Sequence, residues 1–387
     1  MSVTAAQGFL ASGVAAGIKE SGAPDLALVV NSGPSFAAAG VFTSNRVMAA
    51  PVRWSRRVVG DGRIAAVLLN SGGANACTGR PGDEDTRLSA ERAAQALGLP
   101  ADEIAVCSTG LIGIRLPMDR VSTGVTEAVT RLSDDGGADA AEAIRTTDSV
   151  RKTSALSAGE PGGGWTVGGM AKGAGMLAPG LATMLVVLTT DAEVPAGELD
   201  RVLRESVRTT FDRVDSDGCM STNDTVLLLA SGASGVIPPP EEFARAVHAV
   251  CLDLARQLTA DAEGASKEIE VEVVGAASER DAVTVGRSIA RNNLLKCALH
   301  GEDPNWGRVL SAIGTTDAVF DPDRLDVAVN GVWVCRDGAA GEAREKTDLT
   351  GRRITITVDL RAGDESAVIW TNDLTAEYVH ENSAYSS

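Results

Sequence analysis

Thr183 is the residue of this 387-residue chain whose surroundings most suggest covalent chemistry. It follows the small Ala182 in KGAGMLAPGLATMLVVLTTDA (residues 172–192) and precedes an apolar run of strand length, Met184–Leu188. A threonine hydroxyl can attack the preceding carbonyl carbon, and water then opens the ester and divides the chain. The new N-terminal amine, with a pKa of about 7.7–8.0, can serve as the base for its own hydroxyl. On pattern alone, a threonine that only begins a strand is the commoner case.

Few other residues offer catalytic or metal-binding chemistry. Three histidines, His248, His300 and His380, are too few for a His-rich metal site. The six cysteines are scattered with no Cys-x-x-Cys spacing, which predicts reduced thiols in a cytosolic protein. Among them, Cys219 is expected to be a buried structural residue. Because the chain also lacks a P-loop and a GxGxxG motif, it predicts neither a metal nor a cofactor.

Six blocks of the chain together indicate a family. One is GGMAKGAGMLAPGLATMLVVLTTDA (168–192), and the others are GFLASGVAAGIKESG (8–22), VCSTGLIGIRLPM (106–118), STNDTV (221–226), ALHGEDPNWGRV (298–309) and DLTAEYVHENSAYSS (373–387). They resemble, in the right order, the ornithine acetyltransferase family, also called the glutamate N-acetyltransferase or ArgJ family. The block 168–192 is similar to the cleavage motif of these self-cleaving threonine enzymes, with Thr183 in the nucleophile position. Any one block is a modest signal, but six in order span the chain and make the resemblance strong.

The resemblance implies a covalent acetyl transfer. Thr183 would first cut the Ala182–Thr183 bond, leaving an α chain of residues 1–182 and a β chain of residues 183–387. It would then take the acetyl group of N-acetylornithine as an ester and pass it to glutamate, in the cyclic pathway of arginine biosynthesis. The family also implies that two processed units pair into an α2β2 assembly.

The resemblance also implies the residues of the site. Thr109, through its hydroxyl, and Gly110, through its backbone N–H, would stabilise the oxyanion. The positions that match substrate contacts of the family are Thr147, Lys172, Thr183, Glu263, Asn382 and Ser387. Thr146 adjoins Thr147, so a shift of one residue stays open. The stretch 217–220 departs from the Asp-Thr of many relatives, which leaves the role of that loop open.

Several alternatives remain at this stage. A related self-processing aminopeptidase or amidase would hand the acyl group to water, and an uncleaved relative would be a non-catalytic binding protein. Whether acetyl-CoA also serves as a donor stays open, as does a role in secondary metabolism. The opening block GVAAGIKESG favours the arginine pathway.

Composition excludes some classes of partner. The net charge of −17 and the lack of a basic tract argue against nucleic acid. The N-terminus lacks the pattern of a secretory signal, and no apolar run approaches the roughly 20 residues of a membrane span. We therefore expect a cytoplasmic protein.

Short strands and amphipathic helices alternate irregularly, which predicts an α+β fold rather than a doubly wound one. We expect helices at 86–99, 119–132 and 198–211, and a longer helix from the prolines 238–240 to about residue 262. Expected strands are 25–30, 63–70, 104–109, 224–231, 267–275 and 353–360, with Asn330-Gly331 turning a hairpin. The stretch 134–138 is expected to be a loop. The resemblance implies a DmpA/ArgJ-like fold, with stacked sheets flanked by helices (an N-terminal-nucleophile-like sandwich) and a smaller C-terminal α/β part.

Overall fold

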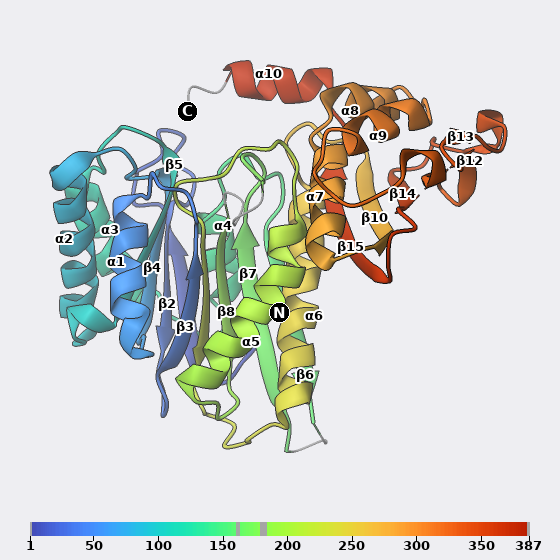
Figure 1. The fold of residues 1–387 in the computed structure, drawn as a ribbon. Helices are drawn as coiled ribbons and strands as arrows, with labels where there is room; N and C mark the ends of the chain where they lie inside the picture. The colour runs from blue at the N-terminus through green and yellow to red at the C-terminus, as the bar shows by residue number, and fades with distance from the viewer. Residues whose placement is uncertain (1, 160–162, 179–183, 385–387) are drawn as a thin grey trace. The chain divides into compact units, whose positions relative to one another are not determined.

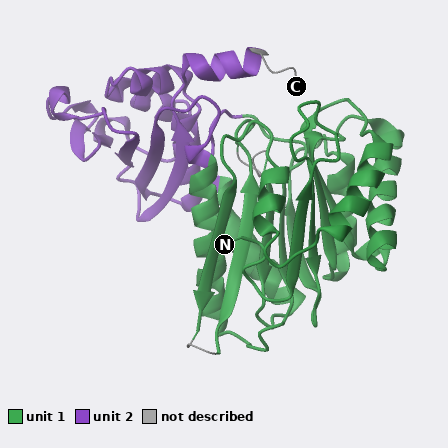
Figure 2. Ribbon diagram, turned by 180° about the vertical axis from the view of Figure 1, so that it is seen from behind, with its two compact units in different colours: residues 1–212, 219–258, 387 green, residues 213–218, 259–386 purple. Residues whose placement is uncertain are grey.

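The computed structural model describes residues 2–159, 163–178 and 184–384. The chain divides into two compact units (Figure 2). Unit 1 comprises residues up to 212 together with 219–258, and unit 2 comprises residues 213–218 and 259–386. Both units contain helices and sheets, so the predicted α+β class is confirmed (Figure 1).

Unit 1 is built on two stacked β-sheets. The first has the order β1-β2-β4-β5, with β1 (Phe9–Val14), β2 (Leu26–Asn31), β4 (Ala66–Gly73) and β5 (Ile104–Leu111). The second has the order β3-β9-β8-β7-β6, with β3 (Ala37–Phe42), β6 (Lys152–Ala158), β7 (Trp165–Lys172), β8 (Leu185–Thr190) and β9 (Thr225–Ala230). Side chains of both sheets, such as Leu69 and Leu227, share one core, which confirms the predicted stacking.

Helices cover the outer face of each sheet (Figure 1). Helices α2 (Gly79–Leu97) and α3 (Met118–Thr130) pack on the first sheet, beside α1 (Ala50–Val58). On the second sheet lie α5 (Ala196–Thr209), which packs on β3, and α6 (Pro240–Ala260), whose Phe243 ring lies against Trp165 of β7. Because both faces of β2, β8 and β9 are covered, these strands are nearly continuous apolar runs instead of alternating ones.

The predicted helices of unit 1 are confirmed, with shifts at their ends. The apolar positions of α6 at steps of three and four are all at most 1% exposed: Phe243, Val247, Val250, Leu254 and Leu258. Helix α2 starts seven residues before the predicted residue 86, and ends where Gly98 adopts a left-handed φ of 69°.

The predicted loop at 134–138 was wrong in its second part, because helix α4 (Gly137–Ala143) begins there. Ala140, Ala141 and Ala143 are fully buried in the core that the two sheets share. Gly137 allows this close packing, since a Cβ there would lie 1.8 Å from the Ser2 hydroxyl. A short helix of small residues has no long apolar stripe, so periodicity could not reveal it.

Unit 2 contains a six-stranded sheet with the order β13-β12-β11-β14-β10-β15. Its strands are β10 (Glu268–Ala276), β11 (Asp326–Val329), β12 (Val332–Arg336), β13 (Ala339–Ala340), β14 (Arg353–Asp359) and β15 (Glu365–Asn372). Its helices are α7 (Glu279–Ala290), α8 (Asn293–His300), α9 (Trp306–Ile313) and α10 (Ala376–Ala384). The predicted hairpin is confirmed: Asn330 and Gly331 join β11 to β12 with φ values of 47° and 80°.

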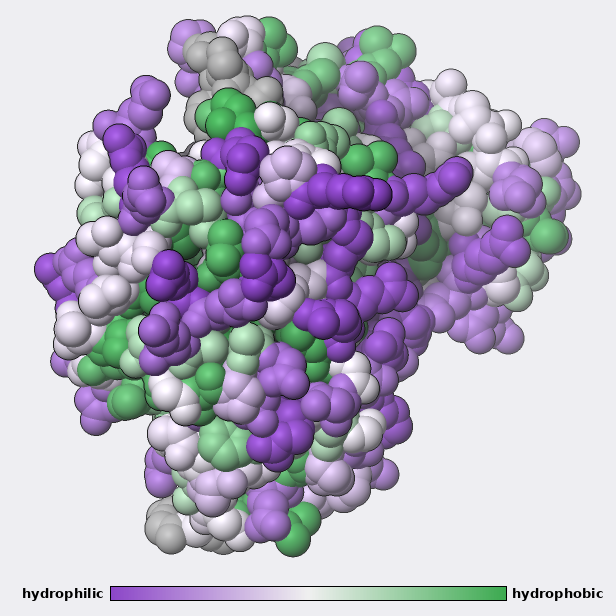
Figure 3. All heavy atoms as spheres, turned by 90° about the vertical axis from the view of Figure 1, so that its left-hand side faces the viewer, coloured by the Kyte–Doolittle hydropathy of each residue, from purple (hydrophilic) through white to green (hydrophobic). Residues whose placement is uncertain are grey.

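On the face shown in Figure 3, hydrophilic side chains predominate and hydrophobic ones form small separate groups. Within the described ranges, none of the helices combines the length and the hydropathy that crossing a membrane requires.

Candidate active site

The end of strand β5 brings Thr109 and Gly110 to the edge of the shared core. Strands β4 and β5 run parallel, so that Gly110 lies opposite Gly72, and the register shifts at Gly73. Gly110 has a φ of 123°, and a Cβ there would lie 2.5 Å from backbone atoms of both Gly72 and Gly73. Thr109 is only 2% exposed. The close approach of the two strands at Gly110 therefore requires glycine. The buried Thr109 hydroxyl lies next to it in sequence.

We expect Gly110→Ala to destabilise the protein by at least about 2 kcal/mol, because backbone atoms in contact at 2.5 Å cannot move aside cheaply. Gly113→Ala is the matched control. Gly113 also has a positive φ, 83°, but a Cβ there meets nothing within 4 Å. Its substitution should cost about 1 kcal/mol, the strain of a positive φ alone. Urea unfolding of both variants measures the difference, and equal losses would contradict the packing argument.

Asn223 of the STNDTV block links the turn before β9 to β5 and to the residue after β4 by hydrogen bonds. Its side-chain amide donates to the carbonyl oxygens of Ala74 at 2.6 Å and Ser108 at 2.8 Å. Ser108 in turn donates to Asn70 on the neighbouring strand at 2.6 Å. The buried turn before β9 and the residues around Thr109 are thereby joined.

Lys172 reaches the same place from the end of strand β7. Its Nζ donates to the Thr109 Oγ1 at 3.3 Å, and its side chain is 2% exposed. On the adjacent strand, Leu185 pairs with Lys172. The strand that begins at Leu185 therefore lies beside the Thr109–Lys172 contact. The role of Lys172 in substrate binding stays a prediction.

Asp148 is the buried anion beside Lys172. Its carboxylate lies 2.7 Å from the Lys152 Nζ and 3.9 Å from the Lys172 Nζ. It accepts hydrogen bonds from the amides of Gly173 at 2.6 Å and Thr146 at 3.0 Å. Burial alone would raise the pKa of Asp148, but the charges of Lys172 and Lys152 and these hydrogen bonds hold it well below its usual range. The carboxylate thus stays ionised in the interior.

Sequence reasoning missed Asp148 and Lys152. Both stand in the stretch TTDSVRK, from which only Thr147 was predicted to take part. The signal that could have found them is an aspartate four residues before a lysine, close to the motif threonines. Such a pair usually indicates a solvated surface, whereas here both side chains are fully buried.

Lys19 of the opening block is a second missed cation. Its Nζ donates to the carbonyl oxygens of Pro24 at 2.9 Å and Arg145 at 2.7 Å. Burial lowers its pKa, and the charges of Lys172 and Arg145 lower it further, against the raising effect of Asp25 and Asp148. Lys19 therefore lies near enough to Lys172 and Asp148 for their charges to act on it.

Asp224 lies beside the first described residue after position 183. Its Oδ1 accepts the Met184 amide at 3.1 Å, and its Oδ2 has no hydrogen-bond partner within the described part of the chain. Burial raises the pKa of Asp224 well above its usual range. The Met184 amide, the nearby hydroxyls of Ser221 and Thr43 and the charge of Lys172 offset only part of this effect. The pKa of Asp224 is thus shifted in the direction opposite to that of Asp148.

Thr147 lies half-buried in the loop after α4, next to Asp148. The neighbouring Thr146 faces Asp148, because its amide donates to that carboxylate and its Oγ1 lies 3.5 Å from the same oxygen. Both threonines thus stand at the buried charges, and the choice between them as a substrate contact stays a prediction.

Glu263 and Asn382 meet within unit 2. The Asn382 Nδ2 donates to the Glu263 Oε2 at 2.9 Å, and Asn382 is exposed on α10. The loop that carries Glu263 packs on the start of this helix, since Thr375 donates to the Gly264 carbonyl at 2.8 Å. A Cβ on Gly264, whose φ is 62°, would lie 2.3 Å from the Tyr378 nitrogen. Two predicted site residues far apart in sequence are thereby brought together.

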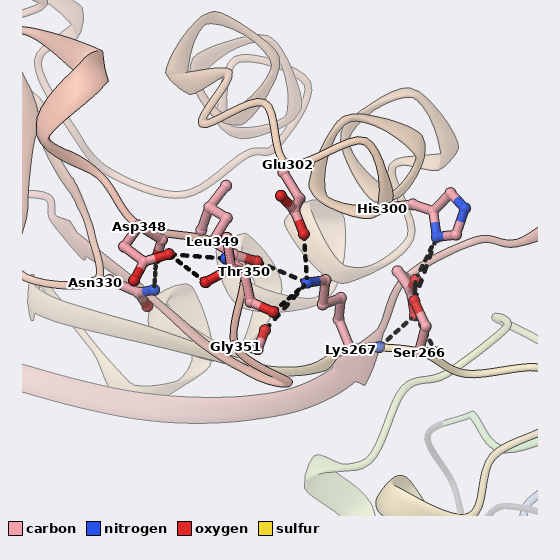
Figure 4. A network of polar contacts seen from close by, with 10 residues as sticks. Ser266, Lys267, His300, Glu302, Asn330, Asp348, Leu349, Thr350 and Gly351 are labelled. Carbon is pink, nitrogen blue, oxygen red and sulfur yellow. Dashed lines mark hydrogen bonds and ion pairs between the residues drawn. The ribbon is translucent and has the colours of Figure 1, made fainter.

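A buried carboxylate fixes the base of this loop. Asp373 accepts the amides of Ser266 at 2.9 Å and Lys267 at 2.8 Å, and its Oδ2 lies 2.8 Å from the His300 Nδ1. Figure 4 shows Ser266 and His300 side by side at this point. These contacts join the chain after Glu263 to the residues that precede α10.

Three predicted site residues, Ala182, Thr183 and Ser387, lie outside the described residues. Among the residues that are described, no three His, Cys, Asp or Glu side chains are grouped to hold a metal ion. All six cysteines are free thiols. The prediction for Cys219 was wrong, because it is exposed. It lies in the loop before the STNDTV turn.

Comparisons with known proteins indicate the same family as the sequence motifs. The chain matches the ArgJ family over residues 10–387. It is 70% identical, over all 387 residues of both chains, to the arginine biosynthesis bifunctional protein ArgJ of Streptomyces avermitilis. The protein of the same name from Mycobacterium leprae is 58% identical, with 100% of this chain and 96% of that one covered. Among solved structures, ArgJ from Bacillus halodurans is similar with 35% identity and a TM-score of 0.50, covering 51% of this chain and 98% of its own.

Proposed function

The chain belongs to the ArgJ family, and from this premise we propose that it cuts itself between Ala182 and Thr183 and then transfers the acetyl group of N2-acetyl-L-ornithine to L-glutamate. It is an enzyme of arginine biosynthesis with small-molecule substrates. The observation that carries the site assignment is the buried contact of 3.3 Å between Thr109 and Lys172, beside the strand that begins at Leu185.

The proposed transfer has two half-reactions. In the first, the Thr183 hydroxyl adds to the acetyl carbonyl while its own α-amine takes the proton. The Thr109 hydroxyl and the Gly110 N–H hold the oxyanion. The carbon–nitrogen bond then breaks, the proton goes to the departing nitrogen, and ornithine leaves. In the second half-reaction the amine of glutamate attacks the acetyl ester, which releases N-acetylglutamate and restores the hydroxyl.

The remaining site residues have binding roles in this proposal. Thr147, Lys172, Glu263, Asn382 and Ser387 would contact the substrate, as the family resemblance implies. The hydrogen bond between Asn382 and Glu263 supports a shared role for these two residues.

The proposed cut falls between two neighbouring strands of one sheet. Strand β7 precedes it, strand β8 follows it, and the two are paired antiparallel from Val167–Thr190 to Lys172–Leu185. An α chain of residues 1–182 and a β chain of 183–387 would therefore stay joined by this ladder and by the core. The match to the solved Bacillus halodurans chain includes 98% of that chain but only 51% of this one. That chain therefore has about the length expected of one of the two proposed fragments.

The acceptor decides between acetyl transfer and hydrolysis. We expect glutamate to accelerate the release of ornithine from N-acetylornithine, with one N-acetylglutamate formed per ornithine, because the acetyl ester waits for an amine. Chromatography of both products with and without glutamate measures this. Parallel double-reciprocal plots would fit the covalent intermediate. Release of acetate at a rate that glutamate does not change would mean an amidase instead.

Three finer features belong to the same proposal. Acetyl-CoA would be a second acetyl donor, which the same assay tests when it replaces N-acetylornithine. Two cleaved units would form an α2β2 assembly, to be read from the native mass. The enzyme would work in the cytoplasm, which the six free thiols support because reducing compartments keep cysteines unpaired.

A further inference from the structure

The contact between Lys172 and Thr109 has a fixed direction. An ammonium group has three donors and no acceptor, so the Thr109 oxygen must accept the hydrogen bond of 3.3 Å. The hydrogen of the Thr109 hydroxyl therefore points to another group. Both side chains are 2% exposed, and in such surroundings a neighbouring charge acts strongly on an O–H bond.

We propose that Lys172 acts on the reaction through Thr109, by polarising its hydroxyl so that it donates more strongly to the oxyanion. Asp148 and Lys152 are the positioning residues that hold Lys172 in place. The inference rests on the proposed role of Thr109 in the oxyanion site. It gives Lys172 a task in the transition state, beyond the binding of substrate.

The position of Lys172 is set by one carboxylate. Asp148 lies 3.9 Å from the Lys172 Nζ with one oxygen, and its other oxygen contacts the Lys152 Nζ at 2.7 Å and the Gly173 amide at 2.6 Å. Because Gly173 directly follows Lys172, the same carboxylate holds the backbone and approaches the side chain. All three charged side chains are at most 2% exposed, so the arrangement is shielded from water.

Positive charge lies close to the Thr109 hydroxyl. Lys172 contacts it directly, and Lys152 lies on the Asp148 carboxylate beside Lys172. An oxyanion at Thr109 would place a negative charge near the Lys172 ammonium. This attraction exists in the transition state and not in the ground state, which is the condition for lowering the barrier.

A double-mutant cycle tests the inference. Thr109→Ala, Lys172→Met and the double variant are prepared, the cleaved fraction of each is counted by mass spectrometry, and kcat and KM for N-acetylornithine are measured per cleaved enzyme. If Lys172 acts through Thr109, Lys172→Met lowers kcat about tenfold, the loss of one charge-assisted hydrogen bond. The double variant then stays within about twofold of Thr109→Ala, because the effects share one path.

Other outcomes of the cycle overturn the inference. If the two losses in kcat multiply, or if Lys172→Met changes only KM, Lys172 binds substrate independently of Thr109. In either case the proposed oxyanion role of Thr109 stands. If Thr109→Ala leaves kcat unchanged, the oxyanion role itself fails, and the inference fails with it.

Variants of Asp148 test the positioning. We expect Asp148→Asn to lose kcat as Lys172→Met does, with no further loss when the two are combined, and Asp148→Glu to recover part of it. Full activity of Asp148→Asn would remove Asp148 from the scheme. If Asp148→Asn fails to fold, Lys152→Met tests the positioning in another way, because it removes the cation that holds the Asp148 carboxylate in place. We expect this variant to lower kcat as well, and full activity would remove Asp148 and Lys152 from the scheme.

Lys267 provides a matched control for the removal of a buried lysine. In unit 2 its Nζ donates to the carbonyl oxygens of Leu349 at 2.6 Å, Thr350 at 3.3 Å and Gly351 at 3.1 Å (Figure 4). It also lies 3.2 Å from a Glu302 oxygen. Lys267→Met should lower the melting temperature and leave kcat per folded enzyme unchanged. A drop in kcat equal to that of Lys172→Met would show that any lost buried lysine has this effect, and would overturn the inference.

Discussion

Thr183→Ala protein is expected to remain a single chain of 39.7 kDa and to transfer no acetyl group. The methyl group of alanine cannot attack the Ala182 carbonyl, so no ester forms and no new N-terminus appears. The same substitution removes the nucleophile that would carry the acetyl group. Cleavage and transfer should therefore be lost together, below the detection limit of each assay.

Intact-mass spectrometry under denaturing conditions measures the first effect, and ornithine release measures the second. The wild-type chain should give two fragments whose masses sum to the whole plus one water, the second beginning at Thr183. Thr183→Ser is the control, since it keeps a hydroxyl and should still cut. A cleaved or active Thr183→Ala protein would exclude Thr183 as the nucleophile. An uncut wild-type chain would point to a non-catalytic relative.

Thr109→Ala should lower kcat by about 10²–10³-fold, the effect of losing one oxyanion donor of about 2.7–4 kcal/mol. The structure adds a cost in stability, because the substitution leaves the buried Lys172 Nζ without its contact at 3.3 Å. The two effects are separated by thermal unfolding and by steady-state kinetics on the cleaved enzyme.

Two variants control this prediction. Thr109→Ser keeps the hydroxyl and should retain most of kcat. Thr189→Ala removes another fully buried hydroxyl of unit 1, which donates to the Val3 carbonyl at 2.7 Å. It should reduce stability and leave kcat unchanged. If Thr189→Ala slows turnover as much as Thr109→Ala, the loss reflects a weakened core and says nothing of an oxyanion.

The fold was predictable where local chemistry decides the conformation. The turn at Asn330-Gly331 needs two residues with positive φ, which asparagine and glycine tolerate, and both adopt it. Helix α6 shows its buried face as apolar residues at steps of three and four. Helix α4 escaped prediction because small residues such as Ala140 and Ala141 carry no periodic signal, and are buried only because two sheets enclose them.

By itself the sequence determined the family, the class of reaction and the short list of residues for it. The family blocks are short continuous motifs. Such motifs can indicate that Thr183 supplies a hydroxyl and that Thr109 has an oxyanion role. Only the tertiary structure decided which side chains meet. Lys172 touches Thr109 from 63 positions away, and Asn382 reaches Glu263 from 119 positions away. It also decided that Asp148 and Lys152 are buried while Cys219 is exposed. The physical reason is that burial, and with it the strength of a charge, depends on neighbours that the fold alone brings together.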